Sequence, residues 1–507
     1  MLDANRKDLV LGIVGAGLMG RGIAQIAALA GIEVLMFDLR AGAAEEAKAA
    51  LEQTLSMLVD KGKLSADERA AAAGRIVPAA ALGEFARCHV VVEAIIEKLD
   101  AKRDLFRQLE GVVGDDCLLA SNTSSLAVTS IAAACRLPER VAGFHFFSPV
   151  PLMKIVEVIE GVLSAPWVGE TLTALARRMG HTPVRAKDTP GFIVNHAGRG
   201  FLTEALRIVG EGVADFATVD RVLRAAAGFR LGPFELLDLT GLDVSHPVME
   251  SIYRQFYDEV RFRPTVITAQ RMAAGLLGRK TGEGFYRYVD GKAESPAEAP
   301  VPSPAVLPPV WVAPGPRQAM VAETAAGLGA AIETGIEPSA GALVLVAPLG
   351  LDATAAAAGL PAERVVAIDT LFPIATGACQ RRVLMTNPAT TAPWRDAAHA
   401  LFAADGARVS VLRDSPGFIA QRVVAMIVSV ATEIAQQRIA SPADIDTAVR
   451  IGLGYPRGPL TMGDMLGAST ILEILANMHR LTGDPRYRPS AWLRRRAQLG
   501  LSLLQDD

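Results

Sequence analysis

A glycine-rich turn near the start of the chain restricts the fold strongly. Residues 10–38 read VLGIVGAGLMGRGIAQIAALAGIEVLMFD, in which an apolar run of β-type residues leads into Gly15, Gly17 and Gly20. Small apolar residues then recur at helical spacing, and a second apolar run ends at Asp38, 18 residues beyond Gly20. A GxGxxG turn that follows a strand, opens a helix and precedes such a carboxylate is typical of a dinucleotide-binding βαβ unit. The sequence therefore predicts an α/β, Rossmann-type domain at the N-terminus.

The turn also predicts how a dinucleotide is held. Gly15 permits the tight turn, Gly17 lets the backbone approach a pyrophosphate, and Gly20 lets helix and strand pack closely. Leu18 and Met19 open the helix, whose N-terminal N–H groups and positive dipole end favour phosphate. We therefore assign these five residues to cofactor binding.

Asp38 indicates which dinucleotide is bound. A carboxylate at this position accepts hydrogen bonds from a ribose 2′-hydroxyl and repels a 2′-phosphate. Arg40 lies two residues further on and could favour NADP, but we interpret it as a solvated loop charge. The predicted cofactor is NAD.

Length, charge and cysteine spacing exclude several other classes of protein. A chain of 507 residues is long enough for three or more domains. The net charge of −3 does not favour nucleic acid or an anionic membrane surface as a partner. The four cysteines lie far apart without CxxC spacing, which argues against a metal site or a disulfide framework. We expect a soluble, cytoplasmic protein, because we find neither a signal peptide nor an apolar run of about 18 residues.

A helical hairpin is predicted after the second strand. Residues 43–73 have a helical pattern, and Ser65 followed by Glu68 is a capping-box signature for the second helix. Lys61 and Lys63 lie at the tip between the helices. They either meet an anionic ligand or are simply solvated.

Two further strand ends carry polar residues. Residues 90–97 read VVVEAIIE, and ligands of open α/β sheets bind beyond the carboxyl ends of strands. Glu97 and Lys102 are therefore candidate crevice residues. The next strand, 118–120, is followed by the hydroxyl-rich run 121–125, which caps a helix, contacts a ligand, or does both.

A histidine and a glutamate form the most informative pair. His145 ends one apolar run, and Glu157 lies within the apolar run 155–159, 12 residues later. A buried carboxylate needs a hydrogen-bonded or charged partner, and His145 is within reach if the two strands pair. A lone histidine is more often a core or loop residue. A histidine and a carboxylate beside a nucleotide crevice instead favour general acid–base chemistry.

The second half of the chain repeats part of the first. The sequence TPGFI at 189–193 recurs as SPGFI at 415–419, an offset of 226. The same offset relates other turn-forming and acidic residues, namely Asp220 and Asp446, Gly228 and Gly454, Gly232 and Gly458, Asp238 and Asp464, and Gly241 and Gly467. A fixed offset through so many positions indicates a duplicated helical domain.

The second copy is predicted to be without catalytic function, because it lacks the glycine turn and the candidate catalytic residues. We expect three replacements: His145 by Asp369, Glu157 by a residue such as Arg382 or Leu384, and Asn195 by Gln421. The predicted domains are a Rossmann domain at 1–187, a helical domain at 188–290, a Pro- and Ala-rich linker at 291–319, a degenerate Rossmann-like segment at 320–412 and a second helical domain at 413–507.

Several motifs resemble the 3-hydroxyacyl-CoA dehydrogenase family over about residues 8–290. They stand in the family's order and spacing: GAGLMGRGIAQ, VVEAIIE, ASNTSSL, HFFSPVPLMKIVEVI, DTPGFIVN and LGPFELLDLTG. The resemblance implies NAD-dependent oxidation of a (3S)-3-hydroxyacyl-CoA to a 3-oxoacyl-CoA. The alternatives are a 3-hydroxybutyryl-CoA dehydrogenase or another hydroxy-acid dehydrogenase of related architecture, and a nucleotide-binding protein without turnover.

The resemblance also implies residue roles. The family's catalytic histidine and glutamate fall on His145 and Glu157, and its substrate-contacting serine and asparagine fall on Ser124 and Asn195. Its cofactor contacts fall on Asp38, Glu97 and Lys102. The family usually has asparagine after HFF, whereas this chain has Ser148, a shorter side chain near the nicotinamide. In the implied mechanism His145 takes the hydroxyl proton and Glu157 orients the imidazole.

The layout with a second helical copy is similar to long bacterial members of the family in phenylacetate catabolism, which act on 3-hydroxyadipyl-CoA. Members with one helical domain pair it with the same domain of a second subunit. An isologous interface uses the same surface on both partners. We therefore expect 413–507 to dock on 188–290 about a pseudo-two-fold axis and to replace a dimer partner, although a homo-oligomer is possible.

Overall fold

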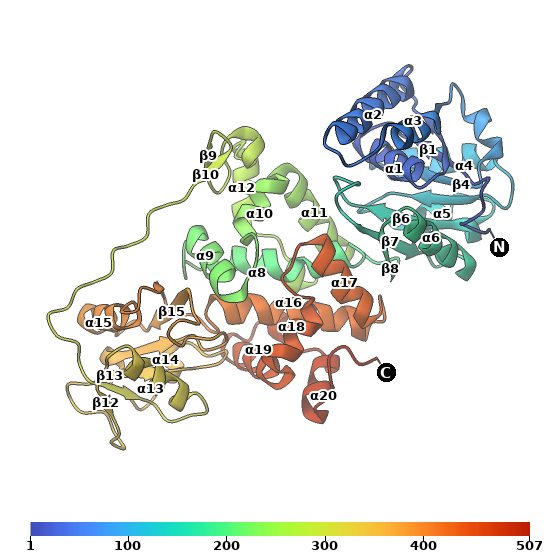
Figure 1. The fold of residues 1–507 in the computed structure, drawn as a ribbon. Helices are drawn as coiled ribbons and strands as arrows, with labels where there is room; N and C mark the ends of the chain where they lie inside the picture. Colours follow the sequence, from blue (N-terminus) through green and yellow to red (C-terminus); the bar gives the residue numbers. More distant parts are fainter. Residues whose placement is uncertain (1, 507) are drawn as a thin grey trace. The chain divides into compact units, whose positions relative to one another are not determined.

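The computed structural model describes residues 2–506, and the chain forms two compact units (Figure 1). The first contains the chain up to His196 together with Gln437–Leu453. The second contains Ala197–Gln436 and Gly454–Gln505. One segment of the C-terminal copy is thus part of the N-terminal unit.

Within the described residues, the first unit holds an eight-stranded sheet in the order β3-β2-β1-β4-β5-β6-β7-β8. Its strands are β1 (Val10–Val14), β2 (Glu33–Phe37), β3 (Ile76–Pro78), β4 (Val90–Glu93), β5 (Leu118–Ser121), β6 (Val141–Phe146), β7 (Ile155–Glu160) and β8 (Thr182–Lys187). The β6–β7 pair is antiparallel and the other neighbouring pairs are parallel. The strand order reverses beside β1, where dinucleotide-binding sheets place their ligand. The predicted Rossmann-type domain is confirmed.

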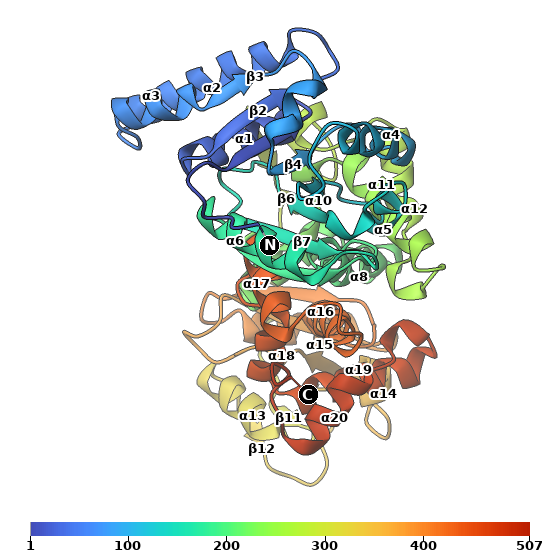
Figure 2. The same ribbon diagram turned by 90° about the vertical axis from the view of Figure 1, so that its right-hand side faces the viewer.

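Helices cover both faces of this sheet, as Figure 2 shows from a second side. They are α1 (Leu18–Leu29), α2 (Ala43–Asp60), α3 (Ala66–Gly74), α4 (Leu99–Glu110), α5 (Val128–Ala132), α6 (Pro166–Arg178) and α17 (Pro442–Gly452), and the short α7 (Val194–Ala197) lies at the boundary between the two units. In β1, Leu11 and Ile13 pack in one core cluster, whereas Val10 and Val14 pack in the other. Burial on both faces explains why the strands read as continuous apolar runs. The predicted hairpin is also confirmed, because Ser65 and Glu68 form the capping box of α3.

The second unit contains both helical copies. The first copy supplies α8 (Arg199–Gly210), α9 (Phe216–Ala227), α10 (Pro233–Thr240), α11 (Leu242–Gln255) and α12 (Val266–Ala273), followed by the hairpin of β9 (Arg287–Val289) and β10 (Lys292–Glu294). The second copy supplies α16 (Ile419–Gln436), α18 (Pro459–Leu466), α19 (Ala468–Thr482) and α20 (Ala491–Leu499). Among the described residues, α16 has the length and apolar composition of a membrane-crossing helix, but 89% of it is buried inside the protein.

Three pairs of equivalent residues contact each other across the two helical copies. A methyl group at Gly200 would lie 2.9 Å from the carbonyl oxygen of Met426, the residue 226 positions later. The rings of Phe229 and Tyr455, also 226 apart, have centroids 5.0 Å apart. In the third pair, Arg261 and Arg486 are the middle residues of two short 3-10 helices (Val260–Phe262 and Pro485–Tyr487), which are 225 positions apart. The guanidinium of Arg261 donates to the carbonyl of Arg486 over 3.1 Å.

Contact between equivalent residues is the signature of a two-fold axis. The axis runs where α8 crosses α16, and the crossing is close because Gly200 has no side chain. Within this unit, α16 of the second helical copy thus packs on α8 of the first.

The same unit contains a smaller sheet, which has six strands within residues 2–506, in the order β12-β11-β13-β14-β15-β16. Its elements are β11 (Val310–Val312), α13 (Gln318–Gly327), β12 (Ile332–Glu333), β13 (Leu343–Val346), α14 (Ala353–Ala356), β14 (Val365–Ile368), β15 (Arg381–Thr386), α15 (Ala392–Phe402) and β16 (Arg408–Leu412). The degenerate Rossmann-like segment therefore begins at β11, inside the range predicted as linker, because Val310–Val312 is a buried strand.

The strand register corrects one sequence alignment. His145 lies opposite Glu157 in the β6–β7 pair. In the equivalent β14–β15 pair the backbone N–H of Asp369 donates to the carbonyl of Val383, while Ile368 lies opposite Leu384. Val383 therefore takes the place of Glu157. The expectation of Arg382 or Leu384 was wrong by one residue, which turns a side chain to the other face of a sheet.

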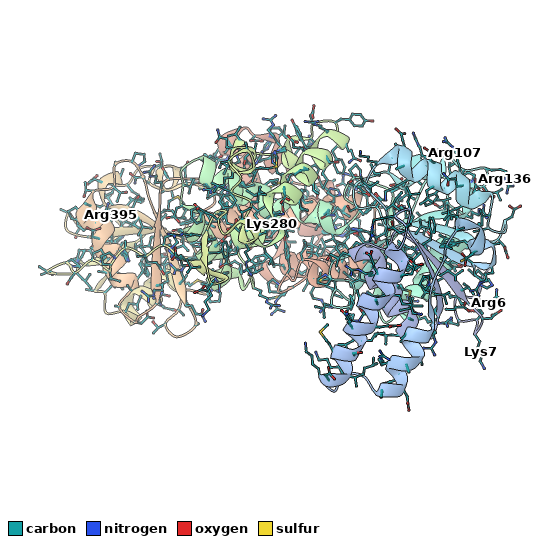
Figure 3. All side chains as sticks on the ribbon, turned by 90° about the horizontal axis from the view of Figure 1, so that it is seen from above. Arg6, Lys7, Arg107, Arg136, Lys280 and Arg395 are labelled. Atoms are coloured by element: carbon teal, nitrogen blue, oxygen red, sulfur yellow. The ribbon has the colours of Figure 1, made fainter. Side chains whose placement is uncertain are left out.

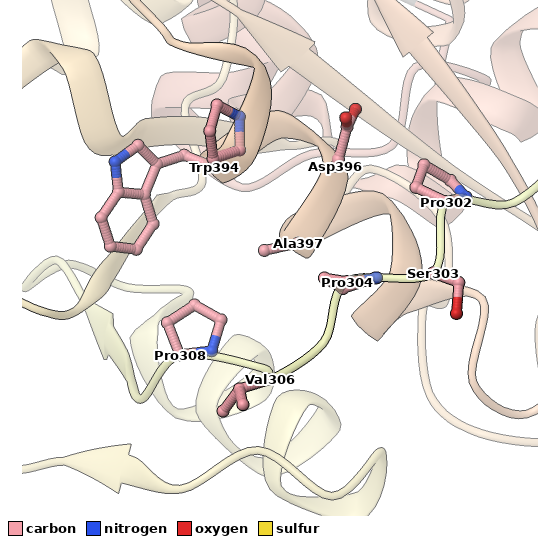
Figure 4. Close-up of a pocket in the computed structure, with 9 residues that line it drawn as sticks. Pro302, Ser303, Pro304, Val306, Pro308, Trp394, Asp396 and Ala397 are labelled. Carbon is pink, nitrogen blue, oxygen red and sulfur yellow. The ribbon is translucent and has the colours of Figure 1, made fainter.

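The linker between β10 and β11 lies against the small domain. Pro304, Val306 and Pro308 of the linker and Trp394 of α15 line a pocket of about 460 Å³ (Figure 4). Glu298 accepts two hydrogen bonds of 2.8 and 2.9 Å from the guanidinium of Arg381. Side-chain contacts with the domain of the smaller sheet thus fix the position of the linker, in addition to the stiffness that its prolines give it.

Several surface cations pair with nearby carboxylates. Figure 3 labels Arg6, Arg107, Arg136, Lys280 and Arg395, which pair with Asp8, Asp104, Asp115, Asp243 and Asp396 respectively. Exposed pairs of this kind contribute little to stability, typically about 0–1 kcal/mol. They reduce the positive potential at these places on the surface.

Candidate active site

His145 and Glu157 form a buried pair at the heart of the first unit. The antiparallel register places them side by side on one face of β6 and β7, with Nδ1 of His145 2.6 Å from Oε2 of Glu157. Their side chains are 5% and 0% exposed. The predicted pairing of the two strands and of the two side chains is confirmed.

The second oxygen of Glu157 fixes the protonation pattern. Oε1 accepts hydrogen bonds from the backbone N–H groups of Ile193 (2.9 Å) and Val194 (2.8 Å). Because both groups donate to Oε1, that oxygen is an acceptor and carries no proton. An ionised carboxylate only accepts, so Nδ1 of His145 carries the proton. The other ring nitrogen, Nε2, is then the basic one.

Two aromatic rings hold the imidazole in place. The ring centroid of His145 lies 4.5 Å from that of Phe147 and 5.7 Å from that of Phe192. Phe192 has φ of 49°, in the left-handed region that bulky residues rarely adopt. Such a residue costs about 1–3 kcal/mol and persists only where its surroundings enforce it. Neither ring is among the residues predicted for the site, although Phe192 belongs to the TPGFI motif.

The glycine turn has the geometry predicted from the sequence. Gly15 has φ of 106°, and a side chain there would collide with the carbonyl of Ala94. A side chain at Gly20 would collide with the carbonyl of Gly15. At Gly17, no atom of the described residues lies within 4 Å of an added methyl group. The turn is thus closely packed on the sheet side and open where a pyrophosphate would approach.

Asp38 holds the glycine turn as well as facing it. Its Oδ2 accepts from the backbone N–H of Ala16 over 2.8 Å, and its Oδ1 accepts from that of Arg40 over 3.0 Å. The Arg40 guanidinium makes two hydrogen bonds of 3.0 and 2.6 Å to Glu46. Arg40 is exposed, as expected, and it is held by an acidic neighbour that disfavours a 2′-phosphate.

A buried charge network lies at the end of β4. The ammonium of Lys102 is 2.6 Å from Oε1 of Glu93 and 3.2 Å from Oε2 of Glu97, and its side chain is only 1% exposed. Glu93 also accepts from the hydroxyl of Ser121 over 2.6 Å. Glu93 is not among the residues predicted for the site, although the run VVVE places it at the buried end of the strand. Lys102 thus lies between two carboxylates, of which Glu97 is the more exposed.

Glu97 joins this network to the hydroxyl-rich run. Its Oε1 accepts from the Thr123 hydroxyl (2.6 Å) and from the backbone N–H groups of Ser124 (2.9 Å) and Ser125 (3.0 Å). Burial alone would raise the pKa of Glu97, but the charge of Lys102 and these hydrogen bonds outweigh it and lower that pKa. The carboxylate of Glu97 thus holds residues 123–125 of the run 121–125, for which the sequence predicts a helix cap, a ligand contact or both.

The remaining predicted residues lie on the segments that these contacts fix. Ser124 follows β5 and is half-buried, and Asn195 is half-buried directly after Val194. Ser148 is exposed in the turn after β6. Asn122 connects the two strand ends, because its Oδ1 accepts from the backbone N–H of Phe146 over 2.8 Å.

The equivalent place in the second copy is filled by its own side chains. Gln421 donates to Oδ1 of Asp369 over 2.9 Å and to the carbonyl of Pro348 over 3.1 Å, and it accepts from the N–H of Gly350 over 2.7 Å. Burial raises the pKa of Asp369. This closed arrangement agrees with a copy that does not carry the chemistry.

Comparisons with known proteins give the following matches. The family model for the NAD-binding domain of 3-hydroxyacyl-CoA dehydrogenase matches residues 10–189. The model for the C-terminal domain of that family matches twice, at 191–288 and at 417–502. These two matches coincide with the two helical copies.

Relatives of two lengths are found. The 3-hydroxyadipyl-CoA dehydrogenase of Escherichia coli K12 is 38% identical over 96% of this chain and 97% of its own length. A probable 3-hydroxybutyryl-CoA dehydrogenase of Deinococcus radiodurans is 40% identical over 55% of this chain and 99% of its own. A crystal structure of 3-hydroxybutyryl-CoA dehydrogenase from E. coli superposes with a TM-score of 0.84 at 36% identity, covering 97% of this chain and 99% of that one.

Proposed function

Because the chain belongs to the 3-hydroxyacyl-CoA dehydrogenase family, an NAD-dependent oxidoreductase of acyl-CoA substrates, we propose that His145 and Glu157 are its catalytic pair. The observation that carries the proposal is the 2.6 Å hydrogen bond between Nδ1 and Oε2, with the second carboxylate oxygen held by two backbone N–H groups. This arrangement leaves Nε2 as an oriented base. The enzyme oxidises a 3-hydroxyacyl-CoA to a 3-oxoacyl-CoA.

The residues of the glycine turn fit the cofactor. Within the described chain, no side chain caps the N-terminus of α1, so its first N–H groups remain available to a pyrophosphate. Gly15, Gly17 and Gly20, with the backbone of Leu18 and Met19, would hold that group. Asp38 would accept from the adenine ribose, and Glu97, supported by Lys102, and Ser148 would border the nicotinamide half. When bound, NAD accepts the hydride from carbon 3 of the substrate.

The proton step is assigned to the imidazole. Nε2 of His145 takes the proton of the 3-hydroxyl, and the ring becomes an imidazolium that already donates from Nδ1 to Glu157. A fixed carboxylate stabilises the charge that forms without moving, which is the basis of electrostatic preorganisation. General base catalysis of this kind contributes about 10²–10⁴-fold to the rate.

Ser124 and Asn195 are proposed to hold the substrate oxygens. Each is anchored by its backbone neighbourhood: Ser124 through Glu97, and Asn195 through Val194 and Glu157. Side chains on such fixed segments can keep carbon 3 aligned for transfer.

The acyl group we propose is 3-hydroxyadipyl. It is supported by the E. coli 3-hydroxyadipyl-CoA dehydrogenase, which matches this chain along nearly its whole length, second helical copy included. The second candidate is 3-hydroxybutyryl-CoA, which gives its name to the E. coli dehydrogenase whose crystal structure superposes on this chain over nearly the same length.

A substrate panel decides between them. Initial rates with NAD would be measured for 3-hydroxyadipyl-CoA, 3-hydroxybutyryl-CoA and 3-hydroxyhexanoyl-CoA, which separates chain length from the distal carboxylate. We expect the highest kcat/KM for the dicarboxylic substrate. A higher value for 3-hydroxyhexanoyl-CoA would contradict the proposed acyl group, and turnover of free 3-hydroxy acids would contradict the acyl-CoA class.

The second helical copy is proposed to take the place of a dimer partner. Support comes from the three pairs of equivalent residues in contact, Gly200 with Met426, Phe229 with Tyr455 and Arg261 with Arg486. A surface already covered within one chain is not available to a second subunit.

A further inference from the structure

The backbone that holds Glu157 belongs to a strained turn. Gly191 and Phe192 both have positive φ, 75° and 49°. The next two residues, Ile193 and Val194, donate their N–H groups to Glu157. A strained segment keeps one conformation only if its surroundings enforce it. The orientation of Glu157 therefore depends on what packs behind this turn.

One segment of the second copy packs there. Residues 437–453, which include α17, belong to the first unit, and α17 lies along β7 and β8 (Figures 1 and 2). The N–H of Lys187, at the end of β8, donates to the carbonyl of Ile439 over 2.8 Å. The second copy is thus attached by its backbone next to the strand that carries Glu157.

The last residue of α17, Gly452, lies directly against Val194. A methyl group added to Gly452 would be 3.0 Å from Cγ2 and 3.1 Å from Cγ1 of Val194. Gly452 is helical and has no positive φ that would call for glycine. Glycine is unfavourable in a helix, so the close approach of Val194 is the physical reason for it here.

We propose that Gly452 of the duplicated copy is a positioning residue of the active site: it seats Val194, and through the Val194 N–H it keeps Glu157 directed at His145. The inference rests on the proposed roles of His145 and Glu157. It means that the degenerate copy, although it has lost the chemistry, completes the catalytic site of the first copy.

The equivalent pair in the other half supports the assignment. At the offset of 226, Val194 corresponds to Ala420 and Gly452 corresponds to Ala226. In the first pair the larger valine goes with glycine, and in the second pair the smaller alanine goes with alanine. The two side-chain volumes thus vary in opposite directions, as expected for two positions in contact. The helix that carries Ala226, α9, packs on β15, the equivalent of β7.

The test compares kcat, KM and melting temperature of full-length variants. Gly452→Ala should lower kcat about 3- to 10-fold and Gly452→Val about 100-fold, because small displacements of catalytic groups have effects of this size. KM for NAD should stay within about two-fold, since the contacts of the glycine turn are not altered. The melting temperature of Gly452→Ala should change little, because the higher helix propensity of alanine offsets the steric cost at Val194.

A matched control and a rescue make the test specific. Gly74 is also the last residue of a helix, α3, but no atom of the described part of the chain lies within 4 Å of a methyl group placed there. Gly74→Ala should leave kcat unchanged. The double variant Gly452→Ala with Val194→Ala recreates the pair of the other half and should restore kcat to within about three-fold of wild type.

Two results would overturn the proposal. One is wild-type kcat in both Gly452→Ala and Gly452→Val. The other is a loss of kcat that Val194→Ala does not reverse. Failure of the underlying function would look different, because the unmodified enzyme itself would then not turn over a 3-hydroxyacyl-CoA.

Discussion

Gly200 and Met426 occupy equivalent positions in the two helical copies and contact each other where α8 crosses α16. Such self-equivalent contact lies on the axis of an isologous interface. Each helical copy also packs a helix on the sheet that precedes the other copy. α17 of the second copy packs on β7 and β8, and α9 of the first packs on β15.

Removing the second copy should therefore expose an apolar face. A fragment ending at Tyr288 is expected to aggregate or to form a homodimer in size-exclusion chromatography with light scattering. Its activity should recover only in the homodimer, where a second α8 can cover the face left by α16. A fragment that stays monomeric, soluble and fully active would show that the second copy is not a substitute partner.

Substitutions in the catalytic pair should lower kcat without lowering the affinity for NAD. His145→Gln should lower kcat by about two to four orders of magnitude, as expected for removal of a general base. Glu157→Gln should also lower kcat, because an amide NH₂ would face the N–H groups of Ile193 and Val194 or the ring nitrogen. Affinity for NAD, measured by fluorescence titration, should be nearly unchanged. Normal turnover in either variant would contradict the pair.

Asp38→Ala should relax the preference for NAD over NADP. Loss of a hydrogen bond to a charged acceptor costs about 1.5–3 kcal/mol, roughly a 10- to 100-fold change in the ratio of kcat/KM values. Asp38 also accepts from Ala16 N–H, so KM should rise for both cofactors. The ratio is the diagnostic quantity, and an unchanged ratio would mean that Asp38 does not contact the ribose. Arg40→Ala is the control, and it should leave the ratio of kcat/KM values for NAD and NADP unchanged.

Lys102→Met should weaken NAD binding, although Lys102 is buried and acts only through its carboxylate partners. It leaves the fully buried Glu93 and the partly exposed Glu97 without their cation. Removing one partner of a buried ion pair typically costs about 3–5 kcal/mol. We expect a lower melting temperature, measured by calorimetry, together with a raised KM for NAD. The double variant Lys102→Met with Glu93→Gln should recover part of the stability.

A buried arginine in the domain of the smaller, six-stranded sheet predicts that stability depends on pH. Arg382 is fully buried and makes two 2.8 Å hydrogen bonds to Asp405, which lower the pKa of that carboxyl from 3.8 to about 2. A depressed pKa contributes stability that is present above pH 4 and is lost as the pH falls towards 2. Asp405→Asn should therefore melt earlier than wild type at pH 6. The difference should shrink between pH 4 and pH 2, and a constant difference would contradict the assigned ion pair.

Local chemistry was sufficient to predict much of this molecule. The glycine turn, the Ser65–Glu68 cap and the two apolar runs around His145 and Glu157 all depend on residues close together in the chain. Two strands joined by a short turn pair antiparallel, which is why the buried carboxylate and the imidazole could be matched in advance. The duplication was visible because special residues recur at one offset.

Folding of the whole chain decided the rest. Val383, and neither Arg382 nor Leu384, lies opposite Asp369, because register depends on pairing geometry that a one-residue shift reverses. The burial of Lys102 between Glu93 and Glu97 depends on how α4 packs against the sheet. The contact of Gly452 with Val194 joins residues 258 positions apart, and no local pattern encodes a contact over such a separation.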